Sequence, residues 1–206
     1  MRIVAISDTH GMYSRVHIPD GDVLIHAGDI TMHGKLEELM LFNTWIATLP
    51  HKHKVVIAGN HDWECEKRPL FARDALADCT YLLDERVEID GLVFYGSPWQ
   101  PTFFNWAFNV DRGAPIKAKW DDIPLDTDVL ITHGPPWEKL DVAPSHQRVG
   151  CEELAKAVER VRPRAHIFGH IHHSYGIVER DGTVFVNASV CNERYEPLNA
   201  PIVFDL

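Results

Sequence analysis

The chain has 206 residues, of which 45% are hydrophobic and 24% charged, and its 30 acidic side chains outnumber its 20 basic ones. This composition is that of an ordinary globular protein and excludes collagen, coiled coil and wholesale disorder. The formal charge of -10 provides no global positive field, which argues against a protein that coats DNA or RNA. A small anionic substrate would need help from cations.

Short apolar runs, each ending in a polar or glycine-containing turn, predict strands that are buried on both faces. These runs are 2–6, 22–27, 54–58, 129–132 and 165–168. Helices are predicted over 35–49 and 151–161, because each apolar pattern there ends near a proline. The segments 87–95 and 175–186 place Asp-Gly between alternating runs and predict hairpins, so the sheets should be mixed.

No internal repeat, low-complexity segment or Gly/Ser/Pro linker divides the sequence, so we expect a single domain over residues 1–206. The least regular segment is 97–124, where prolines and glycines alternate with Trp99, Phe103, Phe104 and Trp106. Two interpretations stay open for these aromatic side chains, which are a substrate-binding wall and a satellite core.

The start of the sequence is unlike a targeting segment. Asp8 comes too early for the apolar region of a signal peptide, and no run approaches the roughly 18 apolar residues of a membrane span. The four cysteines are far apart and show no CxxC spacing, which indicates reduced thiols. We therefore expect a cytoplasmic protein with no membrane partner.

Residues typical of metal ligands follow one predicted strand after another, and histidine is the compositional outlier with 13 copies. The five segments read Asp8-x-His10, Gly28-Asp29, Gly59-Asn60-His61-Asp62, His133-Gly134 and Gly169-His170-Ile171-His172. Each alone has an ordinary explanation as a cap or turn. Because the carboxyl ends of strands in an α/β sheet meet at one crevice, their joint occurrence favours a metal site.

Taken in order, the set DxH, GD, GNHD, HG and GHxH resembles the calcineurin-like metallophosphoesterases over residues 8–172. The sequence at 24–29, 96–101 and 133–136 is similar to the metallophosphoesterase-domain (MPPED) branch, which resembles class III cyclic nucleotide phosphodiesterases. The resemblance implies an α/β fold, a four-layer αββα sandwich with two mixed β-sheets.

The resemblance also implies two bound metal ions. One ion would be held by Asp8, His10, Asp29 and His172, and the other by Asp29, Asn60, His133 and His170. Carboxylate oxygen, imidazole nitrogen and an amide carbonyl suit such ions, and one carboxylate can bridge two of them roughly 3.5 to 4 Å apart. Manganese is favoured, with iron, zinc and nickel as alternatives. Some animal members lack the first histidine of GHxH, whereas His170 is present here, so we expect a complete site.

By the same resemblance, the ions generate a hydroxide for in-line attack on phosphorus, and His61 stabilises the transition state or protonates the leaving oxygen. Protein phosphatases of this superfamily place an aspartate and a phosphate-binding arginine where this chain has Met32 and His33. The missing arginine argues against a phosphoprotein phosphatase. Either Asp62 or a backbone group is then left to orient His61.

We therefore expect a metal-dependent phosphoesterase, preferentially a phosphodiesterase on small diesters such as cyclic nucleotides. Trp99, Phe103 and Trp106 are the candidates to bind substrate, by stacking on a base. The alternatives are a phosphomonoesterase or nuclease with the same site, and a non-catalytic binding scaffold with the same fold. The acidic balance argues against an extended nucleic acid as partner. The sequence leaves the oligomeric state open.

Overall fold

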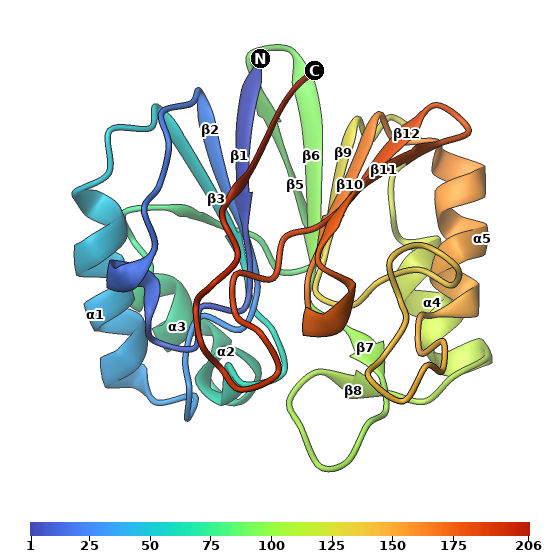
Figure 1. Cartoon of the computed structure of the whole chain (residues 1–206), viewed down its shortest axis with the longest axis horizontal. Helices are drawn as coiled ribbons and strands as arrows, with labels where there is room; N and C mark the ends of the chain where they lie inside the picture. Colours follow the sequence, from blue (N-terminus) through green and yellow to red (C-terminus); the bar gives the residue numbers. More distant parts are fainter.

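The computed structural model describes all residues from 1 to 206. Two mixed β-sheets pack face to face, and helices cover the outer face of each, so the molecule is an αββα sandwich of four layers (Figure 1). The fold class expected from the sequence is confirmed. None of the helices combines the length and the apolar character that crossing a bilayer demands.

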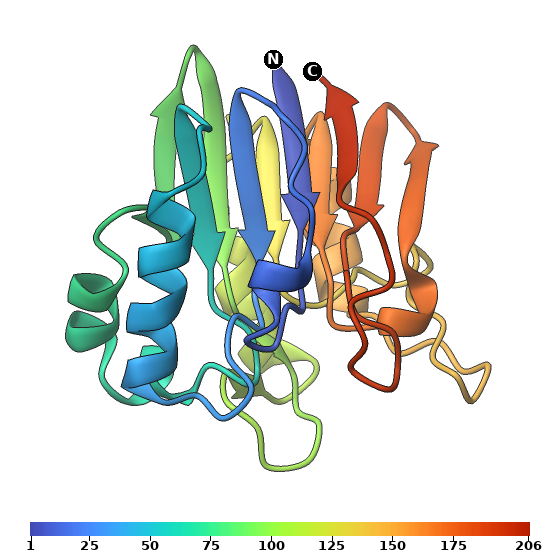
Figure 2. The same cartoon turned by 60° about the vertical axis from the view of Figure 1, so that its left-hand side comes forward.

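The first sheet has the strand order β13-β1-β2-β3-β4. Strands β1 to β4 run parallel, and β13 pairs antiparallel with β1. The bounds are β1 Arg2–Ile6, β2 Val23–Ala27, β3 His53–Ile57, β4 Thr80–Tyr81 and β13 Ile202–Asp205. The helices on its outer face are α1 Leu36–Ala47, α2 Trp63–Lys67 and α3 Pro69–Ala75, preceded by the short helix η1 Tyr13–Arg15 (Figure 2).

The second sheet has the order β11-β12-β10-β9-β6-β5. Its four central strands are parallel, and β5 and β11 are antiparallel hairpin partners at the edges. The bounds are β5 Glu85–Ile89, β6 Leu92–Ser97, β9 Val129–Thr132, β10 Ala165–Phe168, β11 Gly176–Arg180 and β12 Thr183–Asn187. The other elements are the strand pair β7 Gln100–Pro101 and β8 Asn109–Val110, the helices α4 Ala114–Asp121 and α5 Glu152–Val161, and the short helix η2 His172–Ser174.

The five predicted buried strands and both hairpins are confirmed. At the turn between β5 and β6, Asp90 has φ 48° and Gly91 has φ 83°, the left-handed pair that an Asp-Gly hairpin turn requires. Helix α4 lies inside 97–124, which the sequence presented as irregular. Gly113 precedes the helix and Pro115 occupies its first turn, so two residues that suggested a loop are in fact start signals.

Alternate residues of each central strand face different layers. In β1, Ile3 and Ala5 pack between the sheets, whereas Val4 and Ile6 pack under α1 on the outer face. A third apolar layer separates the second sheet from α4 and α5 and includes Trp120. Strands with two apolar faces therefore produce four layers rather than two.

The two chain ends lie side by side at one edge of the sandwich (Figure 1). The amino group of Met1 donates to the carbonyl of Leu206 at 2.8 Å, and the amide of Leu206 donates back at 3.0 Å. The carboxyl ends of the parallel strands, which carry the predicted ligands, lie at the opposite edge.

Candidate metal centre

All seven predicted metal ligands lie where parallel strands of the two sheets end. Asp8 and His10 follow β1, Asp29 follows β2, Asn60 follows β3, His133 follows β9, and His170 and His172 follow β10. Because the two sheets pack face to face, these loops from distant parts of the sequence reach one place.

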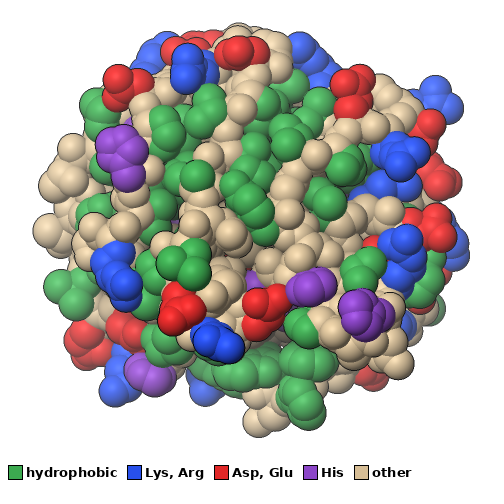
Figure 3. All heavy atoms as spheres, viewed as in Figure 1, with side chains coloured by type: hydrophobic (Ala, Val, Ile, Leu, Met, Phe, Trp, Pro, Cys, Tyr) green, Lys and Arg blue, Asp and Glu red, His purple; other side chains and the backbone are tan.

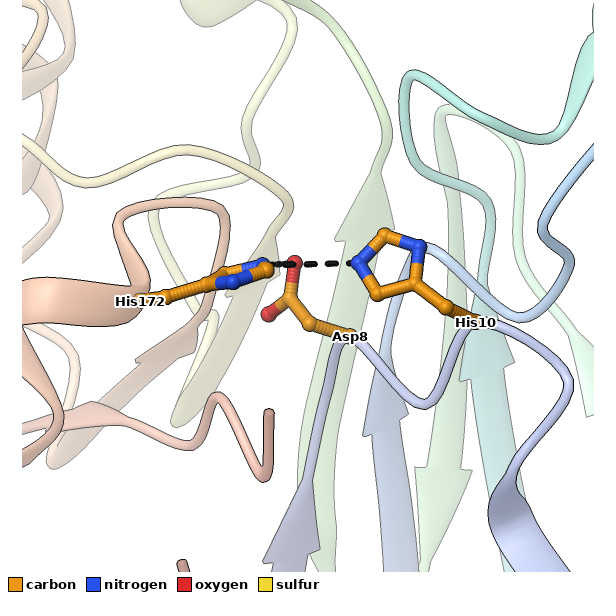
Figure 4. A group of neighbouring side chains, drawn as sticks. All are labelled: Asp8, His10 and His172. Atoms are coloured by element: carbon orange, nitrogen blue, oxygen red, sulfur yellow. Dashed lines mark hydrogen bonds and ion pairs between the residues drawn. The ribbon is translucent and has the colours of Figure 1, made fainter. Parts of the chain in front are cut away.

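One group consists of Asp8, His10 and His172, whose ligand atoms lie within 4.8 Å of one another (Figure 4). The Nε2 atom of His172 is 3.4 Å from Asp8 Oδ1 and 3.4 Å from His10 Nε2. Two imidazole nitrogens thus face each other beside a carboxylate oxygen, an arrangement that a divalent cation would satisfy.

A second group forms around Asp29. Its Oδ1 is 3.4 Å from His133 Nε2, while its Oδ2 is 3.8 Å from His10 Nε2. Asn60 Oδ1 is 2.9 Å from His133 Nε2, and the ring centroids of His133 and His170 are 5.0 Å apart. The two oxygens of Asp29 therefore face different histidines, as a bridging carboxylate requires.

The two buried carboxylates and the histidines that face them shift one another's pKa. Burial opposes ionisation of Asp8 and Asp29, but hydrogen bonds and charges from neighbouring histidines outweigh it and hold both carboxyl pKa values below the usual range. Burial likewise opposes the charge on His133 and His172, but the carboxylates raise the pKa of each to about 9. In the metal-free chain two imidazolium protons therefore balance two carboxylates, which is the positive charge that one divalent ion supplies.

The other two predicted histidine ligands are neutral. Burial lowers the pKa of His10 to about 4 and that of His170 to about 3. Both can therefore offer a lone pair to a metal at neutral pH without first losing a proton.

Backbone carbonyls orient the histidines with raised pKa values. His133 donates through Nδ1 to the carbonyl of Ala27 at 3.0 Å, and His172 donates through Nδ1 to that of Asn192 at 2.9 Å. Each bond fixes the ring and leaves Nε2 directed at the carboxylates, as is usual for histidines that bind metals.

Four of the predicted ligands have a left-handed backbone although they are not glycine. The φ angles are 55° for Asp8, 44° for His10, 54° for Asp29 and 67° for His170. Such conformations cost about 1 to 3 kcal/mol each and gather at functional sites, where the surrounding structure enforces them. The strained backbone conformations thus occur at residues that the sequence predicted as metal ligands.

Two glycines of the motifs are required by close approach. A Cβ on Gly28 would come within 2.5 Å of His133 Nδ1, and one on Gly169 would overlap the Asp8 carboxylate. Only glycine therefore lets these backbones pass directly behind the ligands.

His61 lies beside the metal ligands and is held by a backbone group. Its Nδ1 donates to the carbonyl of Met32 at 3.0 Å, its ring stacks on Trp106 with centroids 4.4 Å apart, and its Nε2 is 4.0 Å from Asp29 Oδ2. Of the two groups expected to orient His61, the backbone group is confirmed. It comes from Met32.

Asp62 has a different role from the one considered for it. Its buried carboxylate accepts hydrogen bonds from the amides of Ile30, Thr31 and Gly59 and from the Thr31 hydroxyl, at 2.8 to 3.1 Å. Burial and the charge of Asp29 raise the pKa of Asp62 to about 6. Asp62 therefore joins the loops after β2 and β3 and does not contact the His61 ring.

A cavity of about 520 Å³ opens above the ligands and is lined by Phe103, Phe104 and Trp106 on one side. Phe103 and Phe104 are 51% and 80% exposed, and apolar side chains gather over the β7–β8 loop in the space-filling view (Figure 3). Two of the three aromatic candidates, Phe103 and Trp106, thus lie at the site.

The third candidate, Trp99, lies outside the cavity. Its indole Nε1 donates to Asp84 Oδ2 at 2.7 Å, and its ring meets that of Phe108 edge-on at 5.4 Å. The interpretation of Trp99 as a substrate contact is therefore corrected, because its polar and apolar surfaces both have partners within the fold.

Four participants were missed from the sequence, namely the carbonyls of Ala27, Met32 and Asn192 and the side chain of Tyr195. A carbonyl has no residue-type signature, so no motif could reveal the first three. Tyr195 lines the cavity, with its ring centroid 4.7 Å from that of His10. It lies beyond the last motif, in a segment without chemical pattern.

Comparisons with known proteins agree with this geometry. Residues 1–174 match the calcineurin-like phosphoesterase family. The whole chain is 45% identical to 71% of the human metallophosphoesterase domain-containing protein 1, and 99% of it is 42% identical to 74% of UPF0046 protein K07C11.7 of Caenorhabditis elegans. Among solved structures, TT1561 of Thermus thermophilus superposes with a TM-score of 0.60 at 14% identity, over 90% of this chain and 88% of that one.

Proposed function

The chain belongs to the calcineurin-like phosphoesterase family, and on that premise we propose that it is a metal-dependent phosphodiesterase of small diesters such as cyclic nucleotides. Membership of the family supports phosphoester hydrolysis and dependence on a metal. The proposal adds a site for two ions, the role of His61 and a preference for diesters.

The proposed ligands divide into two sets that share one residue. The first set is Asp8, His10, Asp29 and His172, and the second is Asp29, Asn60, His133 and His170. This division is supported by the two Asp29 oxygens, one of which faces His10 and the other His133. Divalent ions held by these residues, manganese by preference, would supply Lewis-acid chemistry that makes water a nucleophile at neutral pH and offsets the charge of the phosphoryl oxygens.

His61 is proposed as the group that donates a proton to the leaving oxygen. Its Nδ1–H is committed to the Met32 carbonyl, so only Nε2 is free to exchange a proton with substrate. His61 lies within 4.8 Å of the ligand atoms of His10 and Asp29 but belongs to neither proposed set, so on this proposal its loss leaves the ions in place.

The preference for a diester rests on the charge of the cavity wall. Arg112 is the single lysine or arginine that lines the cavity, and its guanidinium already binds the carbonyls of Val149 and Gly150 at 2.8 Å and the Glu152 carboxylate. Glu193 adds a negative charge to the rim. A monoester dianion would therefore meet no free cation beyond the metals, whereas a diester carries one negative charge and presents organic groups that suit an apolar wall.

The direct test is hydrolysis of bis-p-nitrophenyl phosphate beside p-nitrophenyl phosphate. Chelator-stripped protein should turn over neither, and added Mn²⁺ should restore turnover that favours the diester. Preference for the monoester would instead indicate a phosphatase. Two bound ions without turnover of these esters or of a cyclic nucleotide panel would indicate a binding scaffold.

A charge variant tests the reason for the preference. Glu193→Lys places a free cation at the rim and should raise the monoester rate relative to the diester rate. Glu159→Lys makes the same charge change outside the cavity and should leave the ratio unchanged. Equal shifts in both variants would mean that net charge, and not the cavity wall, sets the ratio.

A further inference from the structure

Residues 191–197, here named the closing loop, contribute Glu193 and Tyr195 to the lining of the cavity. The closing loop lies beyond the residues matched by the family model, which end at 174. Cys191 and Pro197, at its two ends, pair in an isolated antiparallel β-bridge. The carbonyl of Asn192 accepts a hydrogen bond from His172. The loop is therefore built into the candidate centre and is not a loose connection.

Asn192 fixes the shape of the closing loop. Its Oδ1 accepts from the amides of Arg194 at 2.9 Å and Glu196 at 3.0 Å, and its Nδ2 donates to the Glu196 carboxylate at 2.8 Å. The Asn192 carbonyl accepts from the amide of Tyr195 at 2.9 Å. These bonds hold Tyr195 at a left-handed φ of 60°, a conformation that persists only when neighbours enforce it.

This backbone places the Tyr195 ring over the ligands. Its centroid lies 4.7 Å from that of His10, 5.7 Å from that of His172 and 6.0 Å from that of His61. The ring belongs to none of the three apolar cores and is 39% exposed. Core packing therefore does not account for a ring held in this position.

Trp106 completes the arrangement from another segment. It stacks on the His61 ring with an interplanar angle of 26°, whereas Tyr195 meets His61 edge-on at 61°. Trp106 and Tyr195 both line the cavity but form no aromatic pair with each other. Trp106 and Tyr195 therefore border the space beside His61 with planes inclined to each other, and His61 covers one face of Trp106.

We propose that Tyr195 is a specificity-determining residue, whose ring forms with Trp106 a slot for a flat aromatic group on the substrate phosphate. The substrate class is then a phosphate ester that carries an aryl group or a nucleobase, and alkyl esters fit less well because they offer no face for stacking. This inference rests on the proposed function, and it assigns the contact to the ring of Tyr195 and not to its hydroxyl.

The test uses binding, so that it does not depend on turnover. Phenylphosphonate and methylphosphonate carry the same acid group and resist hydrolysis, and only phenylphosphonate presents a flat ring. Calorimetry on the Mn²⁺-loaded protein should give tighter binding of phenylphosphonate. Tyr195→Ala should weaken phenylphosphonate binding about tenfold, the cost typical of one stacked ring, and change methylphosphonate binding less than about twofold.

Three further variants make the result decisive. Tyr195→Phe should keep the preference, Trp106→Leu should lose it, and Phe71→Ala, which removes another exposed ring far from the cavity on α3, should have no effect. Elemental analysis of each variant shows whether the metals are retained, which separates loss of the slot from loss of the centre. The proposal is overturned if Tyr195→Phe is as damaging as Tyr195→Ala, or if the preference survives in both Tyr195→Ala and Trp106→Leu.

Two results would distinguish the slot from the proposed function. If the protein shows the phenyl preference but hydrolyses no diester, the slot stands and the phosphodiesterase assignment falls. If it hydrolyses diesters with no dependence on the aromatic group in any variant, the assignment stands and the slot falls.

Discussion

The two sheets contribute unlike halves to the candidate centre. The first-sheet half contains Asp8, His10, Asp29, Asn60 and His61, and the second-sheet half contains His133, His170 and His172. Both carboxylates come from the first sheet, whereas the second sheet supplies only imidazoles. Backbone carbonyls hold rings in both halves, His61 in the first and His133 and His172 in the second, but only the first half has a buried carboxylate, that of Asp62, that joins its loops.

The two sheets therefore have different roles at the centre, because only the first sheet supplies the negative charge. The first half supplies both buried negative charges, together with Asn60 and two imidazoles, whereas the second half supplies imidazoles alone. Asp8 meets His172 and Asp29 meets His133 only because the sheets pack face to face. The carboxylate–histidine pairs that could hold a metal therefore form only where the two sheets meet, and neither sheet alone provides them.

The largest effect should come from the residue that faces both halves. Asp29→Ala should remove both ions and lower turnover by at least about 10³-fold, equivalent to about 4 kcal/mol. Elemental analysis and diester hydrolysis measure the two losses. Asp141→Asn alters another fully buried aspartate, one paired with Arg148 outside the centre, and should keep both ions. Two ions per chain in Asp29→Ala would remove the bridging assignment.

His61 tests whether the first half contains a group that serves catalysis alone. His61→Ala should retain both ions and lose about 10²-fold or more in kcat, because proton donation to the leaving oxygen is lost. An unchanged kcat with full metal content would exclude His61 from the reaction. The deficit should shrink for esters whose leaving groups are strongly acidic, since these need no proton.

Exchanging the charges of the two ligand sets sharpens the comparison. Asp8→Asn should reduce the metal content from two ions to one, because the first set is left with a single shared carboxylate. Asn60→Asp gives the second set two carboxylates and should make its ion harder to remove with a chelator. If both substitutions change metal retention in the same direction, charge is not what distinguishes the two sets.

The hydrogen bonds of Asp62, which join the loops of the first half, can be weakened without changing a predicted ligand. Asp62→Asn places an amide among donors from Ile30, Thr31 and Gly59 and should lower the free energy of unfolding by about 2 to 3 kcal/mol. Denaturant unfolding of the metal-free protein measures this. Asp74→Asn, at an exposed aspartate, should change it by less than about 0.5 kcal/mol.

A matched pair of histidines compares the two sheets directly. His26 of β2 and His166 of β10 are fully buried, each bonds a threonine, and burial lowers the pKa of each to about 3. Below about pH 6.5 each of these histidines is protonated in the unfolded chain but stays neutral in the folded chain. As the pH falls toward about 3, each histidine should therefore lower the free energy of unfolding by up to about 1.4 kcal/mol per pH unit. Replacing either histidine by glutamine should make the free energy of unfolding depend less on pH in this range, by the same amount in both variants. Unequal slopes would show that the charges near His26, those of Asp8 and Asp29 foremost, separate its pKa from that of His166, which burial alone shifts.

The sequence predicted what short local patterns encode. The apolar runs predicted the central strands, and the polar residues directly after them predicted which side chains would lie together, because strand ends in such a sandwich share one edge. Contacts made by carbonyls, such as that of Met32 to His61, have no signature in residue type. Trp99 and Trp106 looked alike in the sequence, and only packing decides that one contacts Asp84 and the other His61.

The pairing of Met1 with Leu206 bears on how the protein can be handled. Both chain ends leave from the edge of the sandwich opposite the cavity (Figure 1). A tag or surface anchor at either end would therefore hold the molecule with its substrate opening turned outward, and a short linker between the ends would allow circular permutation with new ends in an exposed turn such as that at Asp181. Immobilised or permuted forms should thus keep their access to substrate.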